Sequence, residues 1–227
     1  MTGDSRTRIL ETIARSLGRG PLPPEKAIEL DRRLTVPRPN TVPARAQIPH
    51  AEQVDLFVEK AKASLATVER LANNQNIPAA VAGYLKAERL LSKVTHGLAP
   101  ELAALPWSGQ SDLQVKAGQV RDEGEAVVTG VFAAIAETGT LMITSGPEAP
   151  TGNVFLAETH IAVVHVDQVV GPIEDAWTKL RTAQASAATD LPRTVNLVTG
   201  PSRTGDIEAV MYVGAHGPRL LHILLIG

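Results

Sequence analysis

Short, almost unbroken runs of apolar residues fill the second half of the sequence, and they constrain the fold more than any other feature. Glycine, proline or polar residues typical of turns bound each run. Such runs predict strands that are buried on both faces, and these occur in parallel sheets covered by helices. The runs lie at residues 126–136, 141–144, 161–166, 195–199 and 220–226.

Segments with helical periodicity lie before and between these runs. Apolar residues recur at helical spacing over residues 51–72, which predicts a helix of about six turns. Two further helices are expected at residues 79–88 and 173–184, and two short strands at 90–95 and 113–116. The alternation of strands and helices predicts an α/β domain with a largely parallel sheet.

The first 49 residues differ in composition from the rest. Residues 4–17 carry apolar side chains at helical spacing and predict one short amphipathic helix. Seven of the 16 prolines lie between Gly20 and Pro49, so this stretch is expected to be an extended connector. We therefore divide the chain into an N-terminal helix with a proline-rich connector, residues 1–49, and an α/β domain, residues 50–227. The extension should lie across the surface of the domain or act as a lid.

Composition argues against several classes of protein. Aromatic residues make up 3% of the chain and no dense Lys/Arg cluster occurs, so we expect no nucleic-acid partner. The absence of cysteine excludes disulfides, thiolate catalysis and a cysteine-held iron–sulfur cluster in this chain. Without a long apolar run or a signal peptide, a cytoplasmic protein with no membrane contact is expected. The histidines lack the spacing of known metal sites, so we expect no bound metal.

The stretch from Gly200 to Pro218 is the first candidate site. Apolar residues after Asp206 recur at i, i+3 and i+4, which predicts a short helix that ends at Gly214. Residues before this helix can leave backbone N–H groups beside the positive end of its dipole, where anions bind. The proposed ligand-binding residues are Gly200, Pro201, Ser202, Thr204 and Asp206, with Gly214 and Gly217 on either side of a solvent-accessible His216. The alternative is an ordinary helix cap and turn that bind no ligand.

A second polar insertion, from Glu137 to Thr140, interrupts the apolar runs. Its carboxylate and hydroxyls are costly in an apolar setting unless they form hydrogen bonds. The alternative is a β-turn in which Gly139 has positive φ and Glu137 faces water. If the strands that end at Ala136 and Thr199 are near neighbours, both insertions should converge at the carboxyl edge of the sheet. Glu137 and His216 would then be the catalytic groups that move protons, and the ligand would also be bound by Thr138, Gly139, Thr140 and Ser145.

Four segments resemble the LUD-domain family in their order and spacing. They are AIAETGTLMITS (134–145), ETHIAVV (158–164), GPSRTGDIE (200–208) and GAHGPRLLHILLI (214–226). The resemblance extends over residues 51–227 and implies a Rossmann-like sheet similar to the sugar-phosphate isomerase and coenzyme A transferase fold. It also implies a role in a three-part cytoplasmic system that oxidises L-lactate to pyruvate. The partner subunits of such a system carry the iron–sulfur clusters, whereas this chain would hold no cofactor and would bind a small anion such as lactate, pyruvate or phosphate.

Two other functions stay open at this point. One is a stand-alone enzyme of the isomerase or coenzyme A transferase type, with Glu137 as nucleophile or base on an acyl or sugar-phosphate substrate. The other is a regulatory module that binds a small anion through the Gly200 loop alone. Calorimetry with lactate, pyruvate, phosphate and adenine nucleotides would distinguish these functions.

Overall fold

The computed structural model describes residues 4–35, 41–121, 124–187, 190–207 and 210–227. Contacts divide the chain into two units, Met1–Thr41 and Val42–Gly227. The larger unit includes the short helix η1 (Ala44–Ala46), in which Ala46 is fully buried. Residues 42–49, which composition groups with the extension, therefore pack as part of the larger unit.

Two helices lie in the described part of the smaller unit, residues 4–35 and 41. α1 (Ser5–Ser16) confirms the predicted amphipathic helix, and its N-cap Asp4 accepts a hydrogen bond from the N–H of Arg6 (3.2 Å). α2 (Pro24–Thr35) lies in the stretch expected to be extended, so that part of the prediction is wrong. Pro24 is the first residue of α2, a position where a helix tolerates the missing N–H and the fixed φ of proline is favourable.

Six parallel strands form the main sheet of the larger unit, which confirms the predicted α/β class. The strand order is β1-β12-β7-β4-β2-β3, and every neighbouring pair is parallel. In chain order, the strands are β1 (Thr67–Leu71), β2 (Lys93–His96), β3 (Gln114–Ala117), β4 (Ala126–Gly130), β7 (Thr159–His165) and β12 (Leu220–Ile226).

Helix α3 (His50–Ala63) ends earlier than the sequence predicts. Apolar residues keep their helical spacing up to Leu71, but Leu65 has a φ of 71° and the chain then enters β1. β1 pairs with β12, from Thr67 opposite His222 to Leu71 opposite Ile226. This pairing satisfies the backbone of residues 67–71 through a partner far away in the sequence, so the predicted helix is wrong beyond Ala63.

One face of the main sheet is covered by helices. They are η2 (Asn74–Asn76), α4 (Ile77–Ala87), α5 (Pro100–Ala103) and η3 (Trp107–Gly109), and α4 confirms the helix predicted at residues 79–88. Ile77, Leu85 and Trp107 pack with Val128, Ile161 and Leu224 of the sheet. No helix in the described part of the chain is long and apolar enough to cross a membrane.

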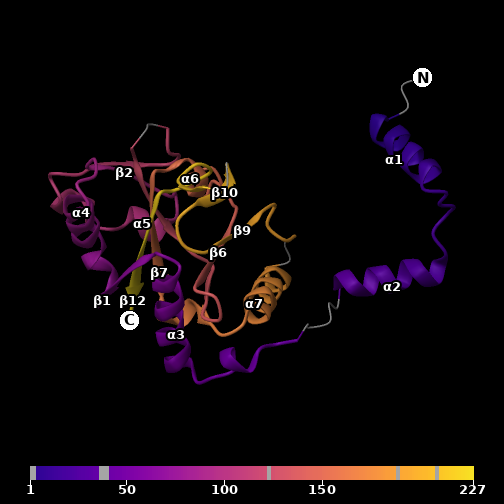
Figure 1. The fold of residues 1–227 in the computed structure, drawn as a ribbon, viewed down its shortest axis with the longest axis horizontal. Helices are drawn as coiled ribbons and strands as arrows, with labels where there is room; N and C mark the ends of the chain where they lie inside the picture. The colour runs from indigo at the N-terminus through magenta and orange to yellow at the C-terminus, as the bar shows by residue number, and fades with distance from the viewer. Residues whose placement is uncertain (1–3, 36–40, 122–123, 188–189, 208–209) are drawn as a thin grey trace. The chain divides into compact units, whose positions relative to one another are not determined.

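A second, smaller sheet lies on the opposite side of the main sheet. Its strands are β5 (Ala133–Ile135), β6 (Thr140–Thr144), β8 (Val169–Val170) and β9 (Val195–Val198), in the order β8-β5-β6-β9. α6 (Asn153–Leu156) and η4 (Val166–Gln168) connect parts of the unit, and α7 (Ile173–Ser186) packs Leu180 in one cluster with Ile135 and Met142. In Figure 1, β7 and β12 run through the middle of the unit, with α4 on one side and β6, β9 and α7 on the other.

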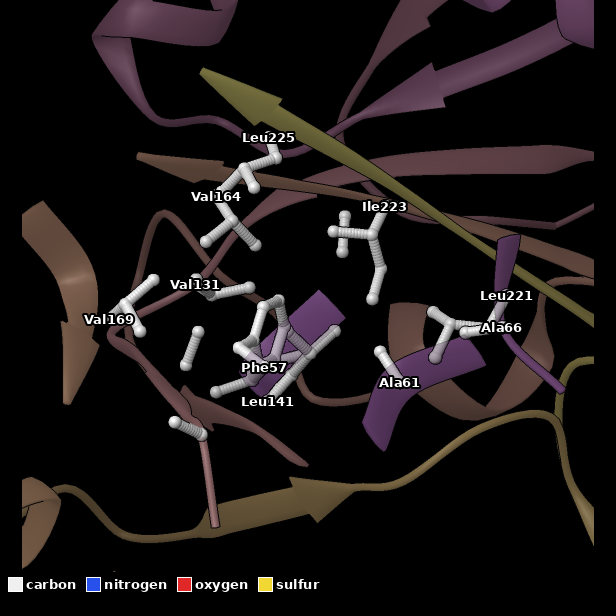
Figure 2. Close-up of a cluster of buried hydrophobic side chains, with 14 of the residues drawn as sticks. Phe57, Ala61, Ala66, Val131, Leu141, Val164, Val169, Leu221, Ile223 and Leu225 are labelled. Atoms are coloured by element: carbon white, nitrogen blue, oxygen red, sulfur yellow. The ribbon is translucent and has the colours of Figure 1, made fainter. Parts of the chain in front are cut away.

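The main hydrophobic core fills the space between the two sheets and α3. Phe57 and Ala61 of α3 pack with Leu141 of β6 and Ile223 of β12. Figure 2 shows Phe57 and Leu141 side by side in this cluster. Each fully buried side chain of this size contributes roughly 1.5–3 kcal/mol to folding, so α3 fixes the second sheet against the first.

The stretch after the Gly200 loop is a β-hairpin and not the predicted helix. β10 (Arg203–Ile207) and β11 (Val210–Val213) pair antiparallel, with Thr204 opposite Tyr212. β-Branched and aromatic residues favour strands, and Gly205 within the segment disfavours a helix. The predicted helix dipole therefore does not exist, and any anion at this loop must be bound by other groups.

Candidate functional site

A cavity of about 600 Å³ lies beside the Gly200 loop. Its walls come from the end of β9, the β10–β11 hairpin, the turn at residues 216–218 and α6. His160 and Leu221, the second residues of β7 and β12, also line it. The cavity therefore lies at the amino ends of two central parallel strands, and the expected position at the carboxyl edge of the main sheet is wrong.

Backbone hydrogen bonds hold the two loops of the cavity together. The N–H of Ser202 donates to the carbonyl of Pro218 (2.8 Å), and the N–H of Gly214 donates to the carbonyl of Ser202 (2.9 Å). A Cβ on Gly217 would lie 3.3 Å from the Cβ of Ser202. This close packing places Ser202 and His216, which belong to different loops, in the lining of the same cavity.

Gly200 is required by the backbone. Its φ is +68°, and a Cβ at this position would overlap the carbonyl oxygen of Ser64, just after α3. Gly214 has a φ of +83° and lies against the side chain of Arg219. These two residues, which the sequence suggests as ligand contacts, shape the loops by being glycine.

The polar lining of the cavity is positive in character. Arg203 and His216 line it together with Ser202 and Thr199, and none of its lining residues in the described part of the chain is acidic. The side chain of Asp206 is not among those described. A guanidinium beside hydroxyl groups is a typical arrangement for binding a carboxylate or phosphate.

His160 is the most deeply buried polar residue of the cavity lining. Its exposed fraction is 0%, and its Nε2 lies 2.8 Å from the hydroxyl of Thr129. Nδ1 has no hydrogen-bond partner among the described residues. Burial lowers the pKa of His160 to about 4, because the interior disfavours the charged imidazolium. The ring is therefore neutral at physiological pH.

Glu137 lies outside this cavity, contrary to the expected convergence with His216. Its carboxylate pairs with Arg45 (Nη2 to Oε1, 3.1 Å), and its N–H donates to the carbonyl of Gly171 (3.1 Å). Gly139 has a φ of +67° and packs directly on the backbone of Ala61 in α3. The β5–β6 turn thus adopts the predicted positive φ at Gly139, but its carboxylate forms an ion pair that joins the turn to η1.

A chain of hydroxyl groups links the same turn to the edge of the cavity. Thr138 Oγ1 lies 2.7 Å from Thr140 Oγ1, which lies 2.7 Å from Thr199 Oγ1. Among these three residues, only Thr199 lines the cavity. Ser145 is also outside it, since its Oγ accepts from the N–H of Thr194 (2.9 Å).

The remaining predicted residues divide in the same way. Pro201 and Gly217 line the cavity, whereas Thr204 is buried within β10 and does not. A separate cavity of about 210 Å³ lies at the carboxyl ends of β2 and β4, where Gly97, Thr129 and Gly130 line it. None of the predicted site residues is among the described residues that line this second cavity.

Metal binding has no support within the described ranges, where no group of three or more His, Asp or Glu side chains could hold an ion. Arg203 and His160 line the cavity but are not among the site residues predicted from the sequence. Arg203 is adjacent to the predicted Ser202, so the signal was present. His160 is the second residue of a buried strand and contacts Thr129 only across the sheet, although the two residues are 31 positions apart in the sequence.

A known protein family matches the chain over the whole of this site. The LUD domain family model matches residues 54–226. Lactate utilization protein C of Deinococcus radiodurans is 34% identical over 107 residues, which cover 47% of this chain and 48% of that protein. Lactate utilization protein C 1 of Bacillus mycoides is 34% identical over 110 residues, covering 48% of this chain and 45% of that protein. The aligned parts thus span about half the length of these relatives.

The fold is similar to a solved structure as well. The crystal structure of a DUF162 family protein from Deinococcus radiodurans superposes with a TM-score of 0.57 at 20% sequence identity. The superposition covers 79% of this chain and 99% of the other. This likeness concerns the fold alone, whereas the family model extends over most of the larger unit and all of the described cavity lining. The chain belongs to the LUD domain family.

Proposed function

We propose that the chain is a component of a lactate-utilisation system and that it binds a small carboxylate, such as lactate or pyruvate, in the 600 Å³ cavity. The observation that carries this proposal is the lining of the cavity. Arg203, His216 and Ser202 lie around it, and the described lining contains no acidic side chain. Arg203 can bind a carboxylate through two parallel hydrogen bonds, and the hydroxyl of Ser202 can donate a third.

The names of two relatives support the choice of ligand. Both are called lactate utilization proteins, and both share about a third of their aligned residues with this chain. A cavity of this volume falls within the usual range for small-molecule sites. Lactate and pyruvate differ only at the 2-position, so one anion site can serve both.

We also propose that partner subunits carry the electron-transfer groups. The chain has no cysteine and cannot hold a cysteine-ligated iron–sulfur cluster by itself. The family resemblance implies such clusters on other subunits of a lactate-oxidising system. In this arrangement, the present chain supplies carboxylate binding and the partners supply redox chemistry.

Calorimetry on the full chain tests the anion site. L-Lactate, pyruvate and phosphate are titrated into the wild type, Arg203→Gln and the control Arg181→Gln, which alters an exposed arginine on α7 outside the cavity. A hydrogen bond to a charged group contributes about 1.5–3 kcal/mol, so Arg203→Gln should weaken carboxylate binding by about tenfold or more. The control should bind like the wild type. Equal affinity in both variants, or no binding of any anion to the wild type, would reject the proposed site.

A genetic test addresses the pathway. A strain that lacks the gene should fail to grow on L-lactate, and the wild-type gene should restore growth. Arg203→Gln should restore growth poorly, whereas Arg181→Gln should restore it fully. Normal growth of the deleted strain on lactate would contradict a role in lactate utilisation.

A further inference from the structure

The buried imidazole of His160 has one satisfied and one unsatisfied nitrogen. Nε2 lies 2.8 Å from Thr129 Oγ1, while Nδ1 is buried and meets no hydrogen-bonding group among the described residues. A buried polar atom without a partner is costly, so such atoms often mark a place where a ligand supplies the bond. His160 lines the large cavity but has an exposed fraction of 0%, so a ligand in the cavity can supply this partner only once the side chains over the ring move aside.

His160 can serve either as a donor or as an acceptor at Nδ1. Burial lowers its pKa to about 4, so the ring stays neutral and carries one proton on one of its nitrogens. When Nε2 holds the proton and donates to Thr129, Nδ1 accepts a hydrogen bond. When the hydroxyl of Thr129 donates to Nε2, Nδ1 carries the proton and donates. The contact with Thr129 is compatible with both states, because a hydroxyl can play either role.

We propose that Nδ1 of His160 forms a hydrogen bond with the oxygen at the 2-position of a bound 2-hydroxy or 2-oxo carboxylate. The hydroxyl of Thr129 then donates to Nε2 or accepts from it, according to the tautomer of the ring. Nδ1 accepts the hydroxyl hydrogen of lactate in one tautomer and donates to the carbonyl oxygen of pyruvate in the other. The carboxylate of the same ligand binds Arg203, and in this respect the inference rests on the proposed function. His160 is thus a positioning and specificity residue, and no bond breaks in this step.

The charges in the cavity favour this orientation of the ligand. Arg203 is exposed and lines the cavity, and its cationic group attracts the carboxylate of a ligand. The neutral His160 lies on the buried strand β7, where a carboxylate would lose its water without gaining an opposite charge. The anionic end of the ligand therefore belongs with Arg203, and the uncharged 2-position belongs with His160.

His222 provides a matched control within the same sheet. It is also buried, its pKa is also lowered to about 4 by burial, and its Nε2 forms no hydrogen bond with a described residue, although Glu69 Oε2 lies 3.6 Å away. Its Nδ1 lies 2.8 Å from the hydroxyl of Thr67. However, His222 stacks on Tyr84 with ring centroids 3.9 Å apart and does not line the cavity. Replacing it tests the cost of losing a buried histidine without altering the cavity.

Calorimetry with three carboxylates tests the inference on the full chain. L-Lactate and pyruvate carry an oxygen at the 2-position, and propionate has none. Wild type should bind lactate and pyruvate roughly five- to tenfold more tightly than propionate, the effect of one ordinary hydrogen bond. His160→Leu should bind all three with similar affinity, close to that of propionate in the wild type. His222→Leu should keep the wild-type preference.

Nuclear magnetic resonance of the imidazole nitrogens provides a second readout that does not depend on a folded variant. Lactate and pyruvate should shift the ¹⁵N signals of His160 in different directions, because they favour different tautomers, whereas propionate should leave them unchanged. If all three carboxylates bind with equal affinity, or saturating lactate leaves the His160 signals unmoved, the inference is wrong and the carboxylate site stands. If no carboxylate binds, the proposed function and the inference both fail.

Discussion

At the scale of single residues, two buried histidines couple stability to pH. Burial lowers the pKa of both His160 and His222 to about 4, from an ordinary value near 6.5. Between these two values, the unfolded chain binds more protons than the folded chain. Stability from these histidines is therefore fully present above pH 6.5 or so and is lost as the pH falls toward about 4.

This linkage predicts a stability difference that one variant can isolate. Each histidine should lower the free energy of unfolding by about 2 kcal/mol between pH 7 and pH 5. His222→Gln removes one of the two titrating groups, so its stability should fall less than that of the wild type over the same interval. Urea unfolding of both proteins at pH 7 and pH 5 measures the effect. Equal losses in the two proteins would contradict the linkage.

Replacement by alanine should change the stability of the protein in opposite directions at two glycines. Gly200 has a φ of +68° and packs on the carbonyl of Ser64, so Gly200→Ala should cost more than about 1 kcal/mol. Gly83 lies within α4, and a Cβ there meets no atom within 4 Å. Gly83→Ala should therefore be neutral or stabilising by up to about 1 kcal/mol. Thermal or urea unfolding distinguishes the two, and similar effects at both positions would contradict the description of the Gly200 loop.

The sequence identified part of the candidate site at this scale. Gly200, Pro201, Ser202, His216 and Gly217 line one cavity because their loops are close in sequence and bracket a single hairpin. His160 could not be found in this way. Its position depends on β7 lying next to β4 and β12, which is a property of the folded sheet.

At the scale of secondary-structure elements, the sequence predicts strands correctly where both faces of the strand are buried. Long apolar runs such as β12 agree with the structure because strands buried on both faces leave an unambiguous pattern. Short or partly exposed elements were misread. Residues 67–71 and the β10–β11 hairpin carry spacings that fit a helix, but strand partners determine their structure.

The β5–β6 turn provides a test of whether Glu137 belongs to the site. Its carboxylate pairs with Arg45, whose side chain is 65% exposed, so the pair should contribute less than about 1 kcal/mol. Since Glu137 does not line the cavity, Glu137→Gln should bind lactate as tightly as the wild type. Calorimetry and urea unfolding of this variant measure both effects. A tenfold or greater loss of lactate affinity would show that Glu137 contributes to the binding site, as the sequence predicts.

At the scale of the whole molecule, the two units differ in how they are stabilised. Apolar residues of α1, including Ile9, Leu10 and Ile13, are about half exposed, whereas the larger unit has a core of fully buried side chains. Composition separates residues 1–49 from an α/β domain at residues 50–227. The contacts place the boundary at Thr41, because Ala46 and its neighbours pack against the larger unit.

Two truncations test this boundary. Removal of residues 1–41 should leave a chain that unfolds cooperatively with nearly unchanged stability. Removal of residues 1–49 should cost stability, because it deletes the buried Ala46, whose carbonyl accepts from Gln53 (3.4 Å) and abuts Gly171. Urea unfolding of both proteins measures the difference. If both truncations behave alike, residues 42–49 are not part of the folded unit.

The central claim is that a small 2-hydroxy or 2-oxo carboxylate binds in the cavity at the amino ends of β7 and β12. A crystal structure of the full chain grown with saturating L-lactate tests this claim most directly. We predict density for the carboxylate beside Arg203 and for the 2-hydroxyl within hydrogen-bonding distance of His160 Nδ1. Lactate bound elsewhere on the chain, or no density in this cavity at saturating concentration, would contradict the account.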